Sequence, residues 1–156
     1  MIEVTMFILM VTIFATYTTF ITLEYGVLPS LSESFYRLKG NYKWFFTLFC
    51  WGIAIPAIVI GNSPLMFIAG SGIAFVGAAT SFKEKLTSVV HTAGAVIGIM
   101  ASQFSIFWEY DMFIVNLITI GLITVIYVFR DIIRNHIWWI EITAFLSIIY
   151  TLYFQL

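Results

Sequence analysis

Charged residues are scarce in this chain: they make up 10% of its 156 residues, whereas apolar residues make up 62%. Soluble domains usually carry about 25% charged residues, and a chain with so few could not cover its apolar surface in water. The sequence therefore predicts that lipid is the solvent for most of its surface. Seven Lys and Arg stand against eight Asp and Glu, and the absence of a basic excess excludes nucleic acid as a partner.

The chain also has only one cysteine, Cys50, which excludes an intrachain disulfide and a cysteine-rich metal site. It contains no glycine-rich phosphate loop and no paired histidines of the HExxH kind, so the common motifs of soluble enzymes are missing. No lysine falls inside an apolar segment, which argues against a retinal Schiff base. Near the N-terminus, the acidic Glu3 stands where a signal peptide would be basic, and we expect the first apolar segment to be retained.

Long segments of the sequence contain no charged residue. Between Glu3 and Glu24 lie 20 uncharged residues, about the number that crosses ~30 Å of hydrocarbon as a helix. No charged residue occurs from Trp44 to Phe82, and the turn formers from Gly61 to Pro64 divide this run into a helical hairpin. The predicted transmembrane helices cover about residues 4–28, 44–60, 65–80, 86–108, 112–129 and 137–156.

The basic residues support this count of six. Six helices have five connections on alternating sides, and every Lys and Arg falls in the first, third or fifth connection. These residues are Arg37, Lys39, Lys43, Lys83, Lys85, Arg130 and Arg134. The positive-inside rule places these loops in the cytoplasm. The sequence thus predicts a single all-α domain in the bacterial inner (cytoplasmic) membrane, with both the N-terminus and the C-terminus outside.

The first connection has a pattern of its own. Ser30 and Glu33 have the spacing of a capping box at a helix start, and Leu31, Phe35 and Leu38 follow at helical spacing. This pattern favours a short helix at about residues 31–39, lying on the inner membrane surface. An irregular loop anchored by its aromatic side chains remains an equal alternative.

Ionisable groups inside a membrane are costly, so they are the first candidates for function. Three fall within the predicted spans: Glu24, His91 and Glu141. At 1.5 Å per residue, each lies roughly 6–8 Å below the inner interface. We expect them to converge on one polar site, with Ser88 close to His91. Further along the same span, Gln103 is expected to hydrogen-bond a neighbouring helix.

Two interpretations of these groups stay open. A histidine and two carboxylates could hold a divalent metal such as zinc, or could form a proton-accepting network without metal. Alternatively, Glu24 and Glu141 reach the interface and its cations, and His91 bonds a hydroxyl or carbonyl group on a neighbouring helix.

Small residues line two of the predicted spans. Gly70, Ala74 and Ala78 recur at four-residue spacing in the third, and Gly94 and Gly98 form a GxxxG pair in the fourth. Such faces let helix backbones approach closely, either within the bundle or between subunits. The sequence therefore suggests a homo-oligomer through these faces as one outcome.

Two stretches, SLSESFY from Ser30 to Tyr36 and VHTAGAV from Val90 to Val96, carry a resemblance. With the six-span layout they resemble the six-span bacterial membrane proteins of the Frag1/DRAM-like group, which implies no established chemistry. Ser88 and His91 are also similar to part of the Ser/His/Asp set of the alkaline-ceramidase and adiponectin-receptor superfamily, whose members are seven-span zinc hydrolases. The late His-xxx-His pair of that superfamily and its seventh span are missing here.

Three functions follow as hypotheses. The first is a non-enzymatic membrane protein, without a cofactor, that binds lipid or a partner or assembles with itself. The second is an intramembrane metal-dependent lipid hydrolase, with His91, Glu24 and Glu141 as ligands or acid/base groups and Ser88 nearby. The third is a proton-coupled transporter or channel that uses the same groups as a relay, although the spans show no paired inverted halves. We favour the first.

Overall fold

The computed structural model describes the backbone of residues 1–79 and 84–156, and the side chains of residues 1–78 and 89–156. This described part is helical and contains no strand, which confirms the predicted all-α class. The helices are α1 (Ile2–Tyr25), α2 (Ser34–Arg37), α3 (Trp44–Gly61), α4 (Pro64–Ala79), α5 (Glu84–Trp108), α6 (Phe113–Val128) and α7 (His136–Tyr153). A single 3-10 turn, η1 (Gly40–Lys43), leads into α3.

Three stretches are long and apolar enough to cross a membrane: Ile2–Tyr25, Gly40–Gly61 and Val89–Trp108. Two shorter apolar helices, Pro64–Ala78 and Phe113–Val128, accompany them. Pro56 lies inside α3, where it removes a helical hydrogen bond. Transmembrane helices tolerate such prolines because their neighbours satisfy the freed backbone groups. Length and composition therefore suggest a membrane protein.

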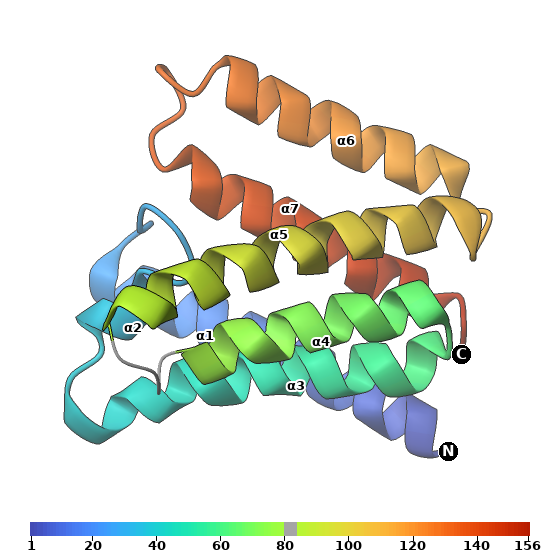
Figure 1. The fold of residues 1–156 in the computed structure, drawn as a ribbon, viewed down its shortest axis with the longest axis horizontal. Coiled ribbons are helices and arrows are strands. Elements are labelled where there is room, and N and C mark those ends of the chain that lie inside the picture. The colour runs from blue at the N-terminus through green and yellow to red at the C-terminus, as the bar shows by residue number, and fades with distance from the viewer. Residues whose placement is uncertain (80–83) are drawn as a thin grey trace.

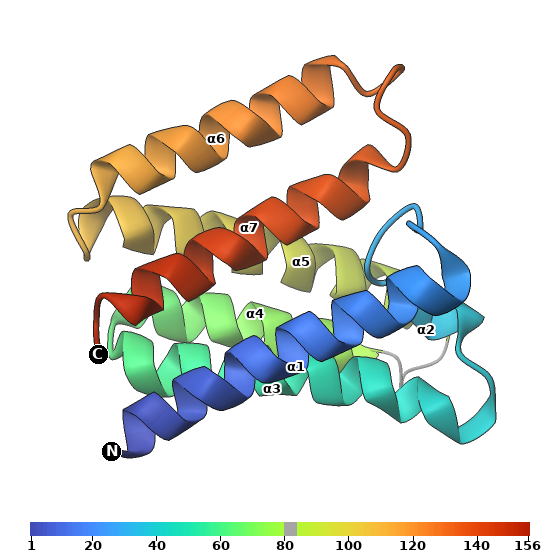
Figure 2. The same cartoon turned by 180° about the vertical axis from the view of Figure 1, so that it is seen from behind.

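The six long helices lie side by side and run back and forth along the molecule (Figures 1 and 2). Both termini lie at one end, together with the α3–α4 and α5–α6 turns. Residues 26–43 and 129–135 lie at the opposite end (Figures 1 and 2). We call this second end the basic end, because Arg37, Lys39, Lys43, Arg130 and Arg134 belong to these two segments.

Residues with left-handed backbone conformations end or begin several helices. Gly26, at φ 76°, follows α1, and its amide donates to the Thr22 carbonyl oxygen at 3.0 Å. The first helix therefore ends before Pro29, where the sequence alone would have ended it. Asn62, at φ 44°, closes α3 and Pro64 opens α4, which confirms the predicted helical hairpin.

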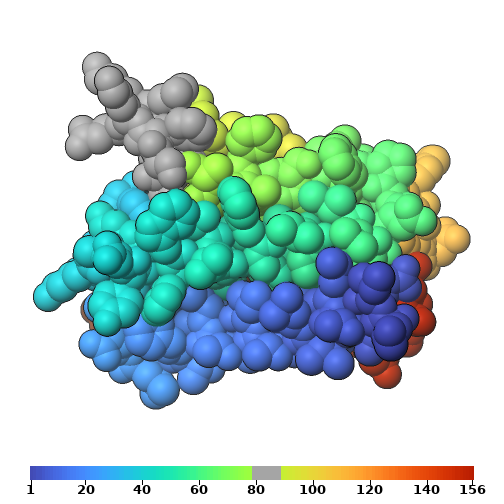
Figure 3. Space-filling model, turned by 90° about the horizontal axis from the view of Figure 1, so that it is seen from below, coloured from blue at the N-terminus to red at the C-terminus, as the bar shows by residue number. Residues whose placement is uncertain are grey.

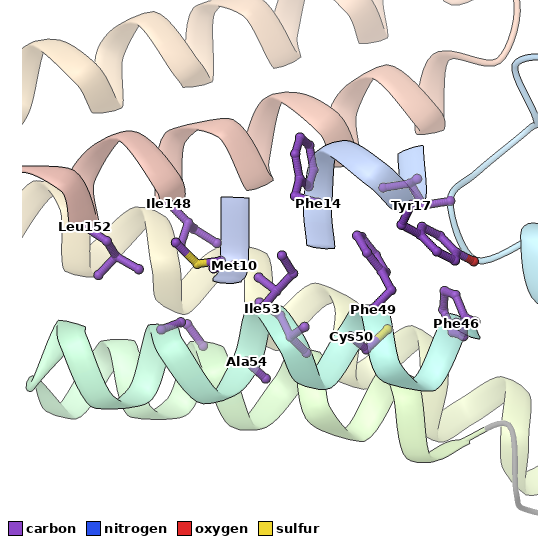
Figure 4. Packing of buried hydrophobic residues seen from close by; sticks show 14 of the residues in the cluster. Met10, Phe14, Tyr17, Phe46, Phe49, Cys50, Ile53, Ala54, Ile148 and Leu152 are labelled. Atoms are coloured by element: carbon purple, nitrogen blue, oxygen red, sulfur yellow. The ribbon is translucent and has the colours of Figure 1, made fainter. Parts of the chain in front are cut away.

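The core is formed mainly where α1, α3 and α7 meet. Figure 4 shows side chains of these three helices pointing toward one another. The Tyr17 and Phe49 rings stack with centroids 4.4 Å apart and an interplanar angle of 18°. Met10, Ile53 and Leu152 are fully buried in the same core. An apolar and aromatic core of this kind leaves few polar atoms between the three helices.

Glycines bring α4 close to both of its neighbours. A Cβ atom on Gly72 would lie 2.7 Å from the carbonyl oxygen of Gly94 and 2.8 Å from the amide nitrogen of Gly98. On another face of α4, a Cβ atom on Gly70 would lie 2.9 Å from the Ala54 carbonyl oxygen of α3. The small-residue faces of α4 and α5 thus serve packing within the chain, one of their two expected uses.

Helix α6 shows a reversed distribution of polar and apolar side chains. Its buried side chains are the polar Asn116 and Thr119, 5% and 4% exposed. Most of its apolar side chains face outward, and Ile114 is 71% exposed. A surface helix of a water-soluble protein has the opposite arrangement. This helix is therefore suited to an apolar solvent.

Candidate functional site

The loop after α1 docks on the N-terminal end of α7. Every second loop residue from Val27 to Leu31 hydrogen-bonds α7 or the residue just before it. The Asn135 side-chain amide donates to the Val27 carbonyl oxygen at 2.6 Å, and the Trp138 amide donates to the Pro29 carbonyl oxygen at 3.2 Å. The Leu31 amide donates to Oε2 of Glu141 at 2.6 Å. Because the first amides of a helix have no partner within it, the loop supplies the cap that α7 needs.

Glu141 therefore has a definite structural partner. It lies on α7, one turn after Trp138, and is only partly exposed. Leu31 is 2% exposed, so its amide is shielded from bulk water, and the carboxylate accepts its hydrogen bond. At 2.6 Å this contact is at the short end of the range for N–H···O hydrogen bonds. The contact holds the loop against the bundle.

The other side of the loop contacts α1. The hydroxyl groups of Tyr17 and Ser34 lie 2.5 Å apart, and Ser34 also donates to the Leu31 carbonyl oxygen. Ser34 is fully buried, and Leu38 is 2% exposed. The leucine side chains of this segment thus face the protein interior. The position of the segment on the inner membrane surface stays a prediction.

The helical part of the loop is also shorter than expected. Helix α2 covers Ser34–Arg37 instead of residues 31–39, and Leu38 after it is extended. Half of the expected capping box is present, because the Glu33 amide donates to Oγ of Ser30 at 3.1 Å. The Glu33 carboxylate does not return to this cap but lies 3.7 Å from the Arg37 guanidinium.

A small cavity of about 40 Å³ lies beneath this loop. Its lining includes Leu31 and Ser32 from the loop, Cys50 from α3 and Glu141 from α7. A buried water needs about 10–15 Å³ of such space, so the cavity can hold about three waters. The polar groups that border it are the Glu141 carboxylate and the Ser32 residue, among mostly apolar neighbours.

The other predicted site residues lie in different surroundings. Glu24 is exposed in the last turn of α1. His91 is half-buried on α5, hydrogen-bonds the backbone of Val76, and its ring centroid lies 6.5 Å from that of Phe46. The side chain of Ser88 lies outside the described residues. For His91, this contact agrees with the alternative in which the histidine bonds a carbonyl group on a neighbouring helix.

Among the described residues, no three His, Cys, Asp or Glu side chains lie close enough together to hold a metal ion. Glu141 and Cys50 border one cavity, whereas Glu24 faces outward. The convergence of Glu24, His91 and Glu141 on one site, with or without zinc, stays a prediction.

A second polar cluster lies at the end of the molecule opposite the basic end, where no sequence pattern indicates a site. The Glu109 carboxylate accepts hydrogen bonds from Ser63 and Ser105, both at 2.6 Å, and from the Leu65 amide at 3.1 Å. Burial opposes its ionisation, but these bonds and one from the Met66 amide outweigh burial and hold the pKa of Glu109 below its usual range. Glu109 therefore caps the N-terminus of α4.

A polar seam joins α5, α6 and α7. The Gln103 side-chain amide donates to Oγ of Ser147 at 3.0 Å, and Asn116 donates to the Gln103 carbonyl oxygen at 2.9 Å. Gln103 thus hydrogen-bonds neighbouring helices, as the sequence predicted. Thr151 lies one turn beyond Ser147, and its buried hydroxyl has no hydrogen-bond partner among the described residues. Interhelical hydrogen bonds of this kind hold helices together where lipid supplies no hydrophobic drive.

Comparison with known proteins adds no relative. No family model matches the chain, and no match was found among curated proteins or solved structures.

Proposed function

We propose that the chain is a six-span integral membrane protein of the bacterial inner membrane, and that it acts by binding lipid or an apolar partner within the bilayer. The observation that carries the proposal is the reversed polarity of α6. This helix buries Asn116 and Thr119 and exposes apolar side chains, as lipid would favour.

The arrangement of the helix ends supports the proposed orientation. The segments with Arg37, Lys39, Lys43, Arg130 and Arg134 share one end of the molecule, and both termini lie at the other (Figures 1 and 2). The positive-inside rule then puts the basic end in the cytoplasm. On this account the shorter helices α4 and α6, and α7, span the bilayer together with the three longer stretches.

The size and use of the cavity beside Glu141 argue against a catalytic site there. Sites for small-molecule ligands measure about 300–1,000 Å³. This cavity measures about 40 Å³, and the nearby carboxylate is already hydrogen-bonded to Leu31. Its geometry supports a structural role for Glu141, as the anchor of the loop.

Elemental analysis tests the proposal against the hydrolase alternative. The protein would be purified in mild detergent without metal-affinity resin, beside its His91→Ala variant. We expect no stoichiometric divalent metal in either protein. Near-stoichiometric zinc in the wild type that is lost in the variant would contradict the proposal and favour the metal-dependent lipid hydrolase. Proton-coupled substrate flux in liposomes, abolished by His91→Ala, would favour the transporter instead.

A further inference from the structure

A long apolar groove runs between α1 and α3 on the outer face of the molecule. Its volume is about 750 Å³, within the range of ligand sites. Figure 3 shows the face on which these two helices lie side by side. The groove extends from Met6 to Phe20 along α1 and from Phe45 to Pro56 along α3. At 1.5 Å per residue it is about 16–21 Å long, slightly more than one leaflet of a hydrocarbon core ~30 Å thick.

The floor of the groove is set by a glycine. A Cβ atom on Gly52 would lie 2.5 Å from Cδ1 of Ile13, so the isoleucine side chain rests directly on the helix backbone. Thr16 and Leu48 form part of the two walls, and Leu48 is 58% exposed. A void against this surface would forfeit dispersion contacts, so an apolar chain is the favoured filling in a bilayer.

The polar side chains in the lining whose hydrogen bonds are described make no demand on a ligand. The Trp51 indole donates to the Ala74 carbonyl oxygen at 3.2 Å, and the Tyr17 hydroxyl is hydrogen-bonded to Ser34. The Thr12 hydroxyl donates to the Ile8 carbonyl oxygen of its own helix at 2.8 Å, which leaves a dry groove without a free donor there. Such a surface suits a hydrocarbon chain better than a polar peptide segment.

Charge at one end of the groove suits a phosphate group. Phe45 lines the groove near the basic end, and Lys43 precedes it by two residues. Lys43 is exposed, and its ammonium nitrogen lies 4.8 Å from the Phe35 ring centroid. Lys39 lies four residues earlier and is exposed, whereas the nearby Arg37 is paired with Glu33. Glu24 is the acidic residue at this end of α1, so the two lysines leave a net positive charge. The exposed aromatic rings of Tyr42 and Trp44 are of the kind that lies at lipid headgroup level.

We infer that the α1/α3 groove binds one acyl chain of a phospholipid, with the lipid phosphate at Lys39 and Lys43. This inference rests on the proposed function, because it needs a chain that lies in a bilayer. It goes further by naming the ligand and its site.

Native mass spectrometry in mild detergent, with added phosphatidylglycerol, tests the inference. Two variants fill the groove from opposite walls, Thr16→Phe and Leu48→Trp. Thr124→Phe, on the exposed part of α6 and outside the groove, is the matched control. We expect the wild type and the control to retain one lipid per chain, and both groove variants to lose at least tenfold in retention. Lys39→Gln with Lys43→Gln should weaken retention of the same lipid severalfold.

Equal lipid retention in the wild type, both groove variants and the control would overturn the inference. So would a wild-type dimer that both groove variants convert to monomer, because the occupant would then be a second copy of the chain. Alkaline extraction of membranes separates this failure from failure of the proposed function. If the wild type resists extraction but retains no lipid, only the inference about the groove fails. If alkali releases the wild type from the membrane, the membrane-spanning proposal fails as well.

Discussion

Glu141 illustrates how one residue can be identified for one reason and used for another. The sequence selected it because a carboxylate within an apolar segment is costly. The structure gives that carboxylate the buried amide of Leu31, which comes from a loop 110 residues away in the chain. No local pattern specifies such a pairing, since it depends on how α1, its loop and α7 are packed. The position of the acid was predictable, and its partner was not.

Glu141→Ala should destabilise the protein, because it leaves the buried Leu31 amide without an acceptor. The expected loss is about 1–3 kcal/mol of unfolding free energy, measured by denaturing-detergent titration. Glu141→Gln keeps one acceptor oxygen and should lose less. Glu24→Ala removes an exposed carboxylate and should change the free energy by about 0.5 kcal/mol or less.

Trypsin cleavage after Arg37 or Lys39 provides a second measurement of the same contact. Cleavage should be faster in Glu141→Ala than in Glu24→Ala, because the loop opens more often. Equal stability and equal cleavage in these two variants would contradict a loop anchored by Glu141.

At the opposite end of the protein, the Glu109 carboxylate makes the stability of the fold depend on pH. Its pKa is lower in the folded protein than in the unfolded chain, so the ionised carboxylate stabilises the fold. That contribution is complete above about pH 5, where the unfolded carboxylate is also ionised, and is lost as the pH falls through about 4 and below. The melting temperature of the wild type should therefore fall in this acid range.

Glu109→Gln should have a lower melting temperature than the wild type at neutral pH, and a smaller drop on acidification. Asp111→Asn is the matched control. Asp111 is an exposed neighbour with a left-handed backbone conformation, and asparagine also tolerates this conformation. If acidification lowers the melting temperatures of the wild type and Glu109→Gln by the same amount, the ionised Glu109 carboxylate does not stabilise the N-terminus of α4.

At the scale of helices, α4 depends on glycine on two faces. Gly70 faces α3, and Gly72 faces Gly94 and Gly98 of α5. The spacing of small residues predicted close packing without indicating which partner each face would have. The positions of the long helices were more predictable: the uncharged segments match α1 and α3 to α7 to within three residues at each end. The short α2 was less predictable. It begins at Ser34, whose hydrogen-bond partner Tyr17 lies 17 residues away on α1, where local spacing cannot indicate it.

Gly72→Leu should disrupt the contact between α4 and α5. Its Cβ atom alone would lie 2.7 Å from a backbone oxygen that cannot move aside cheaply, and overpacking typically costs about 1–3 kcal/mol. The unfolding free energy in mild detergent measures the loss. Gly121→Leu on α6 is the control, because nothing lies within 4 Å of the added Cβ atom. A Gly72→Leu variant as stable as Gly121→Leu would contradict the packing described here.

At the scale of the whole molecule, two separate features agree. The basic residues described in the structure belong to segments at one end of the bundle, and the termini lie at the other (Figures 1 and 2). Around the bundle, α6 places apolar side chains outward and polar ones inward. Charge segregation was visible in the sequence. The reversal on α6 was not, because it requires knowing which side of the helix meets α5 and α7.

Cysteine labelling of the two ends tests the central claim most directly. Cys50→Ala gives a background without cysteine, and single cysteines then replace Asn41 or Asp131 at the basic end, and Pro64 or Gln155 at the other. In intact cells, a membrane-impermeant maleimide should label the cysteines at positions 64 and 155, and should label those at 41 and 131 only after the membrane is permeabilised. Labelling of both ends from the same side would contradict a six-span protein with its basic end in the cytoplasm.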